Sequence, residues 1–479
     1  MPYQTVTPRS YHFHMQRHGK LTRRQLLSAG KVALFGLSLP QFLAAQQGEP
    51  QQVVDTSSFG RAKACILLFM WGGPAHQDTW DLKPQAPREV RGEFNPISTD
   101  VPGIQICEHF PQLSQRCKDL SIIRSMTHNN VNHTTATHFL LTGQAPPPFD
   151  DLSRDWPSLG SVLSKLGRGR APLPPFVSMR PKLENTVPRF VEQSHGQFAG
   201  WLGSSFDPLT IDADPSREDY KVGDFELQPE INVSRLDRRV ELLEQLERRQ
   251  AEVNRRGASV AMSSHYDRAF DLLHSAVGQD AFDVSREPEE IRERYGKNPH
   301  GQSVLQARRL VERGVPLVTV FWPNDGIKNV SVYWDTHSRN FVDLKERLMP
   351  VADQAFSALI DDLKERGMFD DTLVVWTGEF GRTPKVGQRN SDAGAGADGR
   401  DHWPNCFTSV LAGGGIRGGQ TYGTSDRYAA YPASDAMQPV DLMATVHHLL
   451  GIPHHLMLQD NQGRPLVVCP GTVIERLFG

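Results

Sequence analysis

The apolar run at residues 65–71, Cys-Ile-Leu-Leu-Phe-Met-Trp, constrains the fold of this chain more than any other segment. It holds no polar residue and ends in Gly72-Gly73-Pro74, which is typical of a strand buried on both faces of a parallel sheet and followed by a loop. Similar runs follow at residues 317–322, 372–376 and, more weakly, 407–411. Apolar residues at helical spacing occur at 351–366 and 441–450. This alternation predicts an α/β fold with a doubly wound, mostly parallel sheet flanked by helices.

The first 45 residues have the pattern of an export signal. Arg23-Arg24 stands directly before Gln25-Leu26-Leu27, and an apolar stretch follows at residues 32–45. This order is typical of a twin-arginine signal peptide. The stretch is shorter than the roughly 20 residues that a membrane-spanning helix needs. We therefore expect export by the twin-arginine translocation machinery to the periplasm or the medium, without a permanent membrane span.

After the signal we expect a leader or linker at residues 46–61 and one α/β domain at residues 62–479. Residues 150–299 are predicted to form an inserted, partly helical cap, because 171–188 is rich in proline and 234–255 is strongly charged with leucines at helical spacing. The tract at residues 392–399 contains only Gly, Ala and Asp and predicts a mobile loop.

Charge and motifs exclude several classes of function. The formal net charge is -3, so no basic field attracts a phosphate backbone, and we expect no nucleic-acid partner. The G-x-S-x-G pattern of serine hydrolases is absent, and so is the G-x-x-x-x-G-K-[ST] loop of nucleotide hydrolases.

Two polar clusters follow the first strand. His76 and Asp78 stand just after it, where an imidazole and a carboxylate suit a divalent metal ion, although Asp78 could equally cap the next segment. The second cluster joins His133 to Thr134 and Thr135. A threonine hydroxyl needs a metal ion or a base to act as a nucleophile. The alternative is a helix N-terminus capped by threonine.

Two further clusters lie near the later strands. Asp335 and His337 are close enough in sequence to reach one metal ion from an irregular loop. The other cluster begins with Glu379 and Arg382, directly after the strand at 372–376, and continues with Arg400-Asp401-His402. Arg382 or Arg400 could bind an anionic substrate through two parallel hydrogen bonds, or each could be part of a salt-bridged loop.

The order of these groups resembles the alkaline phosphatase superfamily over most of residues 62–452. The sequence motifs that carry the resemblance are residues 71–81, 334–337, 377–383 and 399–404, together with Leu140-Leu141-Thr142-Gly143. They resemble in particular an exported bacterial family catalogued as domain of unknown function 1501, which is assigned to the same superfamily.

This resemblance implies two divalent metal ions, zinc or else manganese, magnesium or calcium. Asp78 and Glu379 would hold one ion, and Asp335, His337 and His402 would hold the other. The superfamily commonly has Asp-His where this chain has Glu379-Phe380, so an imidazole ligand is missing unless His76 or Asp401 replaces it. No Cys or Ser stands where the sulfatase branch forms formylglycine, so that chemistry is not expected.

The function implied is an exported metal-dependent hydrolase of phosphate or sulfate esters. A small-molecule or polysaccharide ester would be attacked in line by Thr134 or Thr135, or by a metal-bound water. Arg382 would assist catalysis, and Arg400 and His133 would contact the substrate. The alternative is a degenerate relative that acts as a polysaccharide-binding or scaffold protein of the cell envelope, an interpretation motivated by Phe380 in place of a metal-binding histidine.

Overall fold

The computed structural model describes residues 58–148, 151–170, 172–181, 193–222, 276–327 and 331–479. The chain divides into two units, Met1–Thr56 and Ser57–Gly479. The predicted signal peptide at residues 1–45 and most of the predicted leader lie outside the described residues. The second unit carries all the helices and strands that the structure describes.

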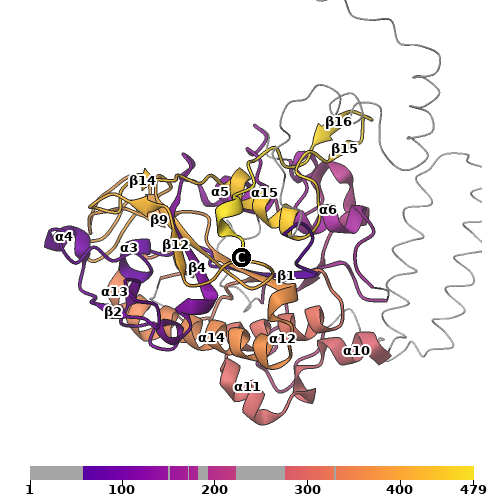
Figure 1. Ribbon diagram of the computed structural model, residues 1–479, viewed down its shortest axis with the longest axis horizontal. Helices are drawn as coiled ribbons and strands as arrows, with labels where there is room; N and C mark the ends of the chain where they lie inside the picture. The colour runs from indigo at the N-terminus through magenta and orange to yellow at the C-terminus, as the bar shows by residue number, and fades with distance from the viewer. Residues whose placement is uncertain (1–57, 149–150, 171, 182–192, 223–275, 328–330) are drawn as a thin grey trace, which may run out of the picture. The chain divides into compact units, whose positions relative to one another are not determined.

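An eight-stranded sheet forms the centre of this unit (Figure 1). In spatial order its strands are β12 (Gln420–Tyr422), β4 (Leu120–Met126), β11 (Phe407–Ala412), β8 (Thr372–Thr377), β1 (Ala64–Phe69), β7 (Leu317–Phe321), β5 (Phe176–Met179) and β6 (Leu209–Ile211). All residues of β1, β7, β8 and β11 are buried, which explains why they appear in the sequence as unbroken apolar runs. The four predicted strands are confirmed.

All strands of the sheet but one run in the same direction. β1 pairs in parallel with β7 and β8, so that Ile66 lies opposite Val318 on one side and Val374 on the other. β11 is antiparallel to both β8 and β4. The predicted mostly parallel α/β sheet is confirmed, with β11 as the reversed strand.

Helices cover both faces of the sheet. Figure 1 shows α11, α12 and α14 together on one side and α5, α6 and α15 on the other. The longer helices are α5 (His133–Thr142), α6 (Leu159–Lys165), α10 (Ala276–Phe282), α11 (Glu289–Tyr295), α12 (Pro299–Glu312), α14 (Met349–Glu365) and α15 (Pro439–Leu449). α14 and α15 are the two helices predicted from apolar spacing. No helix in the described part of the chain is both long and apolar enough to cross a membrane.

The segment at residues 150–299 differs from the predicted cap. Its strands β5 and β6 extend the main sheet beyond β7, in parallel register. β5 is short and follows Pro174-Pro175, which hides it in a proline-rich stretch of sequence. Residues 182–192 and 223–275, including the charged part of the predicted cap, lie outside the described residues.

Short elements complete the unit and carry several polar groups. The short helices are α3 (His76–Thr79), α4 (Arg88–Arg91) and α13 (Asn340–Asp343). Pairs of strands outside the main sheet are β2 (Pro96–Ser98) with β3 (Gln105–Cys107), β9 (Gly381–Arg382) with β10 (His402–Trp403), β13 (Thr424–Ser425) with β14 (Pro432–Ser434), and β15 (Met457–Gln459) with β16 (Pro465–Val467).

Strand direction brings the polar loops to one edge of the sheet. β1, β7, β8 and β4 all end at this edge, and the antiparallel β11 begins there. Ligand sites of open α/β sheets lie at the carboxyl ends of the strands. A layer of buried aromatic rings supports this edge from inside: Trp71 stacks on Phe321 with centroids 4.1 Å apart, and Trp334 meets Trp376 edge-on.

Candidate metal centre

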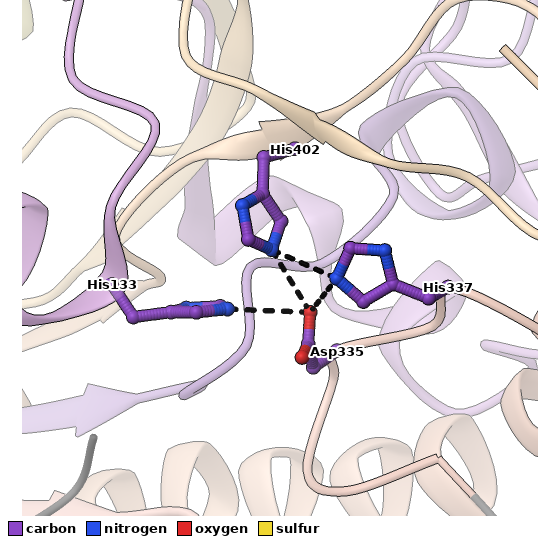
Figure 2. A group of neighbouring side chains, drawn as sticks. All are labelled: His133, Asp335, His337 and His402. Atoms are coloured by element: carbon purple, nitrogen blue, oxygen red, sulfur yellow. Dashed lines mark hydrogen bonds and ion pairs between the residues drawn. The ribbon is translucent and has the colours of Figure 1, made fainter. Parts of the chain in front are cut away.

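Four side chains from three segments converge at this edge. They are His133, the first residue of α5, Asp335 and His337 in the loop after β7, and His402 in β10. Their ligand atoms all lie within 4.8 Å of one another. Figure 2 shows the three imidazoles pointing at one oxygen of Asp335. Asp335 Oδ1 is 3.3 Å from His133 Nε2, 3.0 Å from His337 Nε2 and 3.3 Å from His402 Nε2.

Each imidazole is oriented by a hydrogen bond at its other nitrogen. His402 Nδ1 lies 2.8 Å from the carbonyl oxygen of Val131, and His337 Nδ1 contacts the carbonyl oxygen of Gly394. His133 Nδ1 lies 2.5 Å from Oε1 of Glu379. A carbonyl oxygen only accepts, so Nδ1 of His337 and His402 carries the proton and Nε2 of the neutral ring carries a lone pair. Metal-binding histidines are oriented in the same way.

Two imidazole nitrogens and a carboxylate oxygen face one another at the centre. Nε2 of His337 and Nε2 of His402 are 2.9 Å apart, and both face the Asp335 carboxylate. Burial lowers the pKa of His402 to about 4, so this ring is neutral at physiological pH. Three imidazole nitrogens and one carboxylate oxygen are a ligand set that zinc and other borderline divalent ions accept. The four side chains could therefore hold a metal ion.

The charges around the centre are balanced in the absence of an ion. Burial alone lowers the pKa of His133, but the charges of Asp335 and Glu379 outweigh burial and raise it to about 9. Burial alone would raise the pKa of Asp335, but Arg382 and His133 hold it well below its usual range. His133 therefore carries a proton at neutral pH, and a metal ion would bind in place of that proton.

Close backbone contacts place the loop that carries Asp335 and His337. Trp334 donates its backbone N–H to the carbonyl oxygen of Trp71, at 2.8 Å. Gly72 has φ +101°, and a Cβ there would collide with the backbone nitrogen of Asp335. Tyr333 has φ 54°, a left-handed conformation that is costly for an aromatic residue. The loop is thus held in a strained path by its contacts with the end of β1.

Glu379 and Arg382 form a buried layer behind the ligands. Glu379 Oε1 accepts from the backbone N–H of Gly72 at 2.8 Å as well as facing His133 Nδ1. Arg382 is fully buried and donates to Asp335, to the carbonyl oxygens of Gly72 and Gly73, and to that of Arg400. Neither side chain faces solvent, so both act by orienting the ligands and by setting the charge around them.

Several residues predicted for the site lie elsewhere. Asp78 is buried in a two-point ion pair with Arg400, at 2.7 and 2.9 Å, and also accepts from Asn340. The remaining donors of Arg400 bind the backbone carbonyls of Val90, Thr383 and Pro384. Asp78 is therefore not brought to the centre. The guanidinium of Arg400, predicted to contact the substrate, is likewise buried and engaged by protein acceptors.

The other predicted residues have structural partners. His76 Nε2 lies 2.8 Å from the carbonyl oxygen of Ala429, away from the four-residue group. Asp401 accepts hydrogen bonds from Asn390 and Ser391, and its Oδ1 lies 3.5 Å from His337 Nδ1, behind the ligand. Asp335, His337 and His402, the predicted ligands of one ion, are brought together. His133, predicted as a substrate contact, joins them with its Nε2 turned inward.

The two threonines predicted as nucleophiles lie in the first turn of α5, which Asn132 caps. Thr134 donates its hydroxyl to Asn132 Oδ1 at 2.6 Å, and its backbone N–H binds the same oxygen. The Thr135 hydroxyl exchanges hydrogen bonds with Asn130. The predicted alternative of a helix N-terminus is thus found, but asparagine, not threonine, supplies the cap, and His133 takes the first position of the helix.

A pocket of about 560 Å³ opens over the centre. It is lined by Val131, Asn132, His133, Arg389, Asn390, Ser391, Asp392, Ala393 and His402. Sequence reasoning missed residues 389–391, because they carry no motif, and it treated Asp392 and Ala393 only as the start of a mobile loop. The position of residues 389–391 beside the tract at 392–399 is the signal that could have drawn attention to them.

The sequence matches one family. The family described as "Protein of unknown function (DUF1501)" matches residues 62–478. No curated protein matches the chain in sequence.

The chain is also similar to several solved structures. The lipoteichoic acid synthase LtaP from Listeria monocytogenes is 12% identical, with 87% of this chain and 76% of that chain covered and a TM-score of 0.35. The PsFucS1 sulfatase from Pseudoalteromonas sp. is 15% identical, with 90% and 72% covered and a TM-score of 0.36. The C-terminal periplasmic domain of EcEptC from Escherichia coli, in complex with Zn, is 10% identical, with 82% and 84% covered and a TM-score of 0.34. At these identities and scores the likeness does not extend to chemistry.

Proposed function

The chain belongs to the family described as protein of unknown function DUF1501, and we propose that it is an exported metal-dependent hydrolase of phosphate or sulfate esters. The observation that carries the proposal is the convergence of His133, His337 and His402 on Asp335 beneath an open pocket. A divalent ion bound there would polarise an ester oxygen and stabilise the negative charge that develops on it.

The chain's own residues bind and orient the ion and the substrate. His133 is held by Glu379, while backbone carbonyls hold His337 and His402. Most of the residues that line the pocket have polar or charged side chains, which suits a hydrophilic ester such as a small metabolite or a polysaccharide. Because the hydroxyls of Thr134 and Thr135 are bonded within the helix cap, we propose water as the attacking group.

The geometry supports one ion at this centre. Two ions were implied by the superfamily resemblance, with Asp78 and Glu379 around the second. Both oxygens of Asp78 accept from Arg400, whose positive charge occupies the place that a second ion would need beside that carboxylate. Glu379 retains one buried oxygen, Oε2, without a hydrogen-bond partner in the described structure. We therefore propose a single zinc ion, or a manganese, magnesium or calcium ion in its place.

A second candidate function is a binding protein without turnover. Arg382 contacts the same oxygen of Asp335 that faces the three imidazoles, so it competes with an ion for that oxygen. A centre weakened in this way could bind an envelope polysaccharide, or act as a scaffold, without hydrolysing an ester.

Hydrolysis of 4-nitrophenyl phosphate and 4-nitrophenyl sulfate tests the proposal. The full chain is assayed after loading with zinc, manganese, magnesium or calcium, and again after chelation. His402→Ala is expected to lower the rate at least about 100-fold, since losing metal assistance costs several kcal/mol in the transition state. The matched control is His455→Ala, because His455 is exposed outside the centre. A metal-loaded protein that hydrolyses neither ester would favour the binding protein instead.

Export is the part of the proposal that rests on Arg23 and Arg24. Replacing both by lysine should retain the chain in the cytoplasm, as cell fractionation would show. Equal amounts of the variant and the parent in the periplasm would contradict the twin-arginine route.

A further inference from the structure

Arg389 is the cation that the pocket presents to a substrate. Among the lining residues it is the one arginine or lysine. Its side chain is exposed, and it makes no hydrogen bond or ion pair with any residue that the structure describes. Arg382 and Arg400, which the sequence singled out for anion binding, are buried with their donors bound to protein acceptors. Of these three arginines, Arg389 is therefore the one whose donors are available to a ligand.

The position of Arg389 ties it to the metal centre. A Cβ built on Gly394 would lie 2.9 Å from Arg389 Nε, so the guanidinium rests directly against this glycine. The carbonyl oxygen of the same glycine contacts Nδ1 of His337. Gly394 thus contacts both Arg389 and a candidate ligand, His337, and Arg389 lines the same pocket as the ligands His133 and His402.

Asp401 fixes the segment that carries Arg389. Its Oδ2 accepts the backbone N–H groups of Asn390 and Ser391 at 2.6 and 2.7 Å, and its Oδ1 accepts from the Ser391 hydroxyl at 2.6 Å. Asn390 donates its side-chain amide to the carbonyl oxygen of His402 at 2.9 Å. The residues next to Arg389 are therefore held on the backbone of a ligand residue, while the Arg389 side chain itself stays available.

We propose that Arg389 binds the non-reacting oxygens of a tetrahedral oxyanion, the phosphate or sulfate group of the substrate ester, while the centre holds the reacting oxygen. The inference rests on the proposed function, and it adds the residue that selects anionic over neutral esters. Two parallel N–H donors match two oxygens of such a group. Asp392 is the one carboxylate in the pocket lining, and it disfavours a second anionic group in the same ligand.

Isothermal titration with inorganic phosphate and with inorganic sulfate tests this inference without requiring turnover. The full chain is loaded with zinc, freed of excess metal and compared with Arg389→Gln and Arg389→Lys. Arg389→Gln should weaken binding of the preferred oxyanion about tenfold or more, which corresponds to the loss of one charge-assisted contact. Arg389→Lys should keep part of the affinity, because it retains the charge but not the planar fork.

The control variant is Arg217→Gln. Arg217 is an exposed arginine paired with Asp219 and does not line the pocket. Its oxyanion affinity should equal that of the parent, and elemental analysis should find the same zinc content in all variants. The oxyanion that the parent binds more tightly, phosphate or sulfate, identifies the class of ester.

Three outcomes would overturn the inference: no binding of either oxyanion by the parent, unchanged binding by Arg389→Gln, or loss of zinc from Arg389→Gln. The last would assign Arg389 to the metal centre. If the parent takes up no zinc, the proposed function fails on its own. Weaker oxyanion binding by metal-free Arg389→Gln than by the metal-free parent would then still support the role of Arg389.

Discussion

Glu379 holds His133 through Nδ1 without being one of the four converging residues. We predict that Glu379→Gln lowers zinc affinity about 10- to 100-fold, because an uncharged acceptor makes the imidazole less basic. Competition with a chromogenic chelator would measure the change. Glu108→Gln is the control, since Glu108 bonds to Asn95 at an exposed position. Equal zinc affinity in Glu379→Gln and the parent would show that the buried carboxylate does not tune this ligand.

Gly72 allows the loop that carries Asp335 to approach the end of β1. We predict that Gly72→Ala abolishes zinc binding, because its Cβ would displace the Asp335 backbone. Gly103→Ala is the matched control: Gly103 also has positive φ, +85°, but nothing lies within 4 Å of its Cβ. Both variants share the backbone strain, so zinc titration separates strain from displacement. Zinc bound by Gly72→Ala as tightly as by Gly103→Ala would contradict the argument.

Single residues were predictable where chemistry and sequence spacing coincide. Asp335 and His337 are two residues apart in one loop, and His402 belongs to the sequence motif at residues 399–404. The ion pair between Asp78 and Arg400 was not predictable, because it joins residues 322 positions apart and turns both away from the pocket. Arg389 has no local pattern at all. Its role depends on which side chains the fold leaves without a partner.

At the scale of elements, the segment at residues 389–401 forms the outer wall of the centre. Asp401 holds it through Asn390 and Ser391. We predict that Asp401→Asn speeds tryptic cleavage after Arg389, because local opening governs proteolysis of a loop. Asp398→Asn is the control, since Asp398 is exposed and contributes its backbone carbonyl, not its carboxylate, to Asn340. Identical cleavage rates in the two variants would mean that Asp401 does not hold the segment.

On the side of the sheet that α11, α12 and α14 cover, a buried ion network joins α12 to α14. Arg308 is fully buried and contacts Glu287 at 2.8 Å, Glu312 at 2.6 Å and Asp362 at 2.7 Å. We predict that Arg308→Met lowers the free energy of unfolding by about 3–5 kcal/mol, because buried carboxylates lose their partner. Urea denaturation measures this, with exposed Arg217→Met as control. The folded variant should still bind zinc, since the network does not touch the centre.

Elements were predictable where strands are central and apolar. β1, β7, β8 and β11 are buried throughout and appear as continuous apolar runs. β4 was missed because Ser121, Arg124 and Ser125 interrupt its apolar residues, and β5 and β6 because they are short and lie in the segment taken for a cap. β4, β5 and β6 are recognised as strands only by their pairing with segments far apart in the sequence.

For the whole molecule, an ion at the centre should stabilise the fold, because its ligands come from α5, from the loop after β7 and from β10. We predict that zinc raises the midpoint of thermal unfolding and that a chelator reverses the shift. At 100 times the dissociation constant the gain is about 2.7 kcal/mol by mass action. His455→Ala should show the same shift, and a zinc-independent midpoint would argue against specific binding to the folded state.

The central claim is that His133, Asp335, His337 and His402 bind a divalent ion. Elemental analysis of the purified full chain, exposed to zinc, manganese, magnesium and calcium and then freed of excess metal, tests it most directly. Comparison with the double variant Asp335→Asn/His402→Gln and the control His455→Gln locates the ion. We predict about one ion per chain in the parent and the control, as for a four-ligand site, and none in the double variant. A parent without bound metal, or a double variant that retains it, would contradict the account.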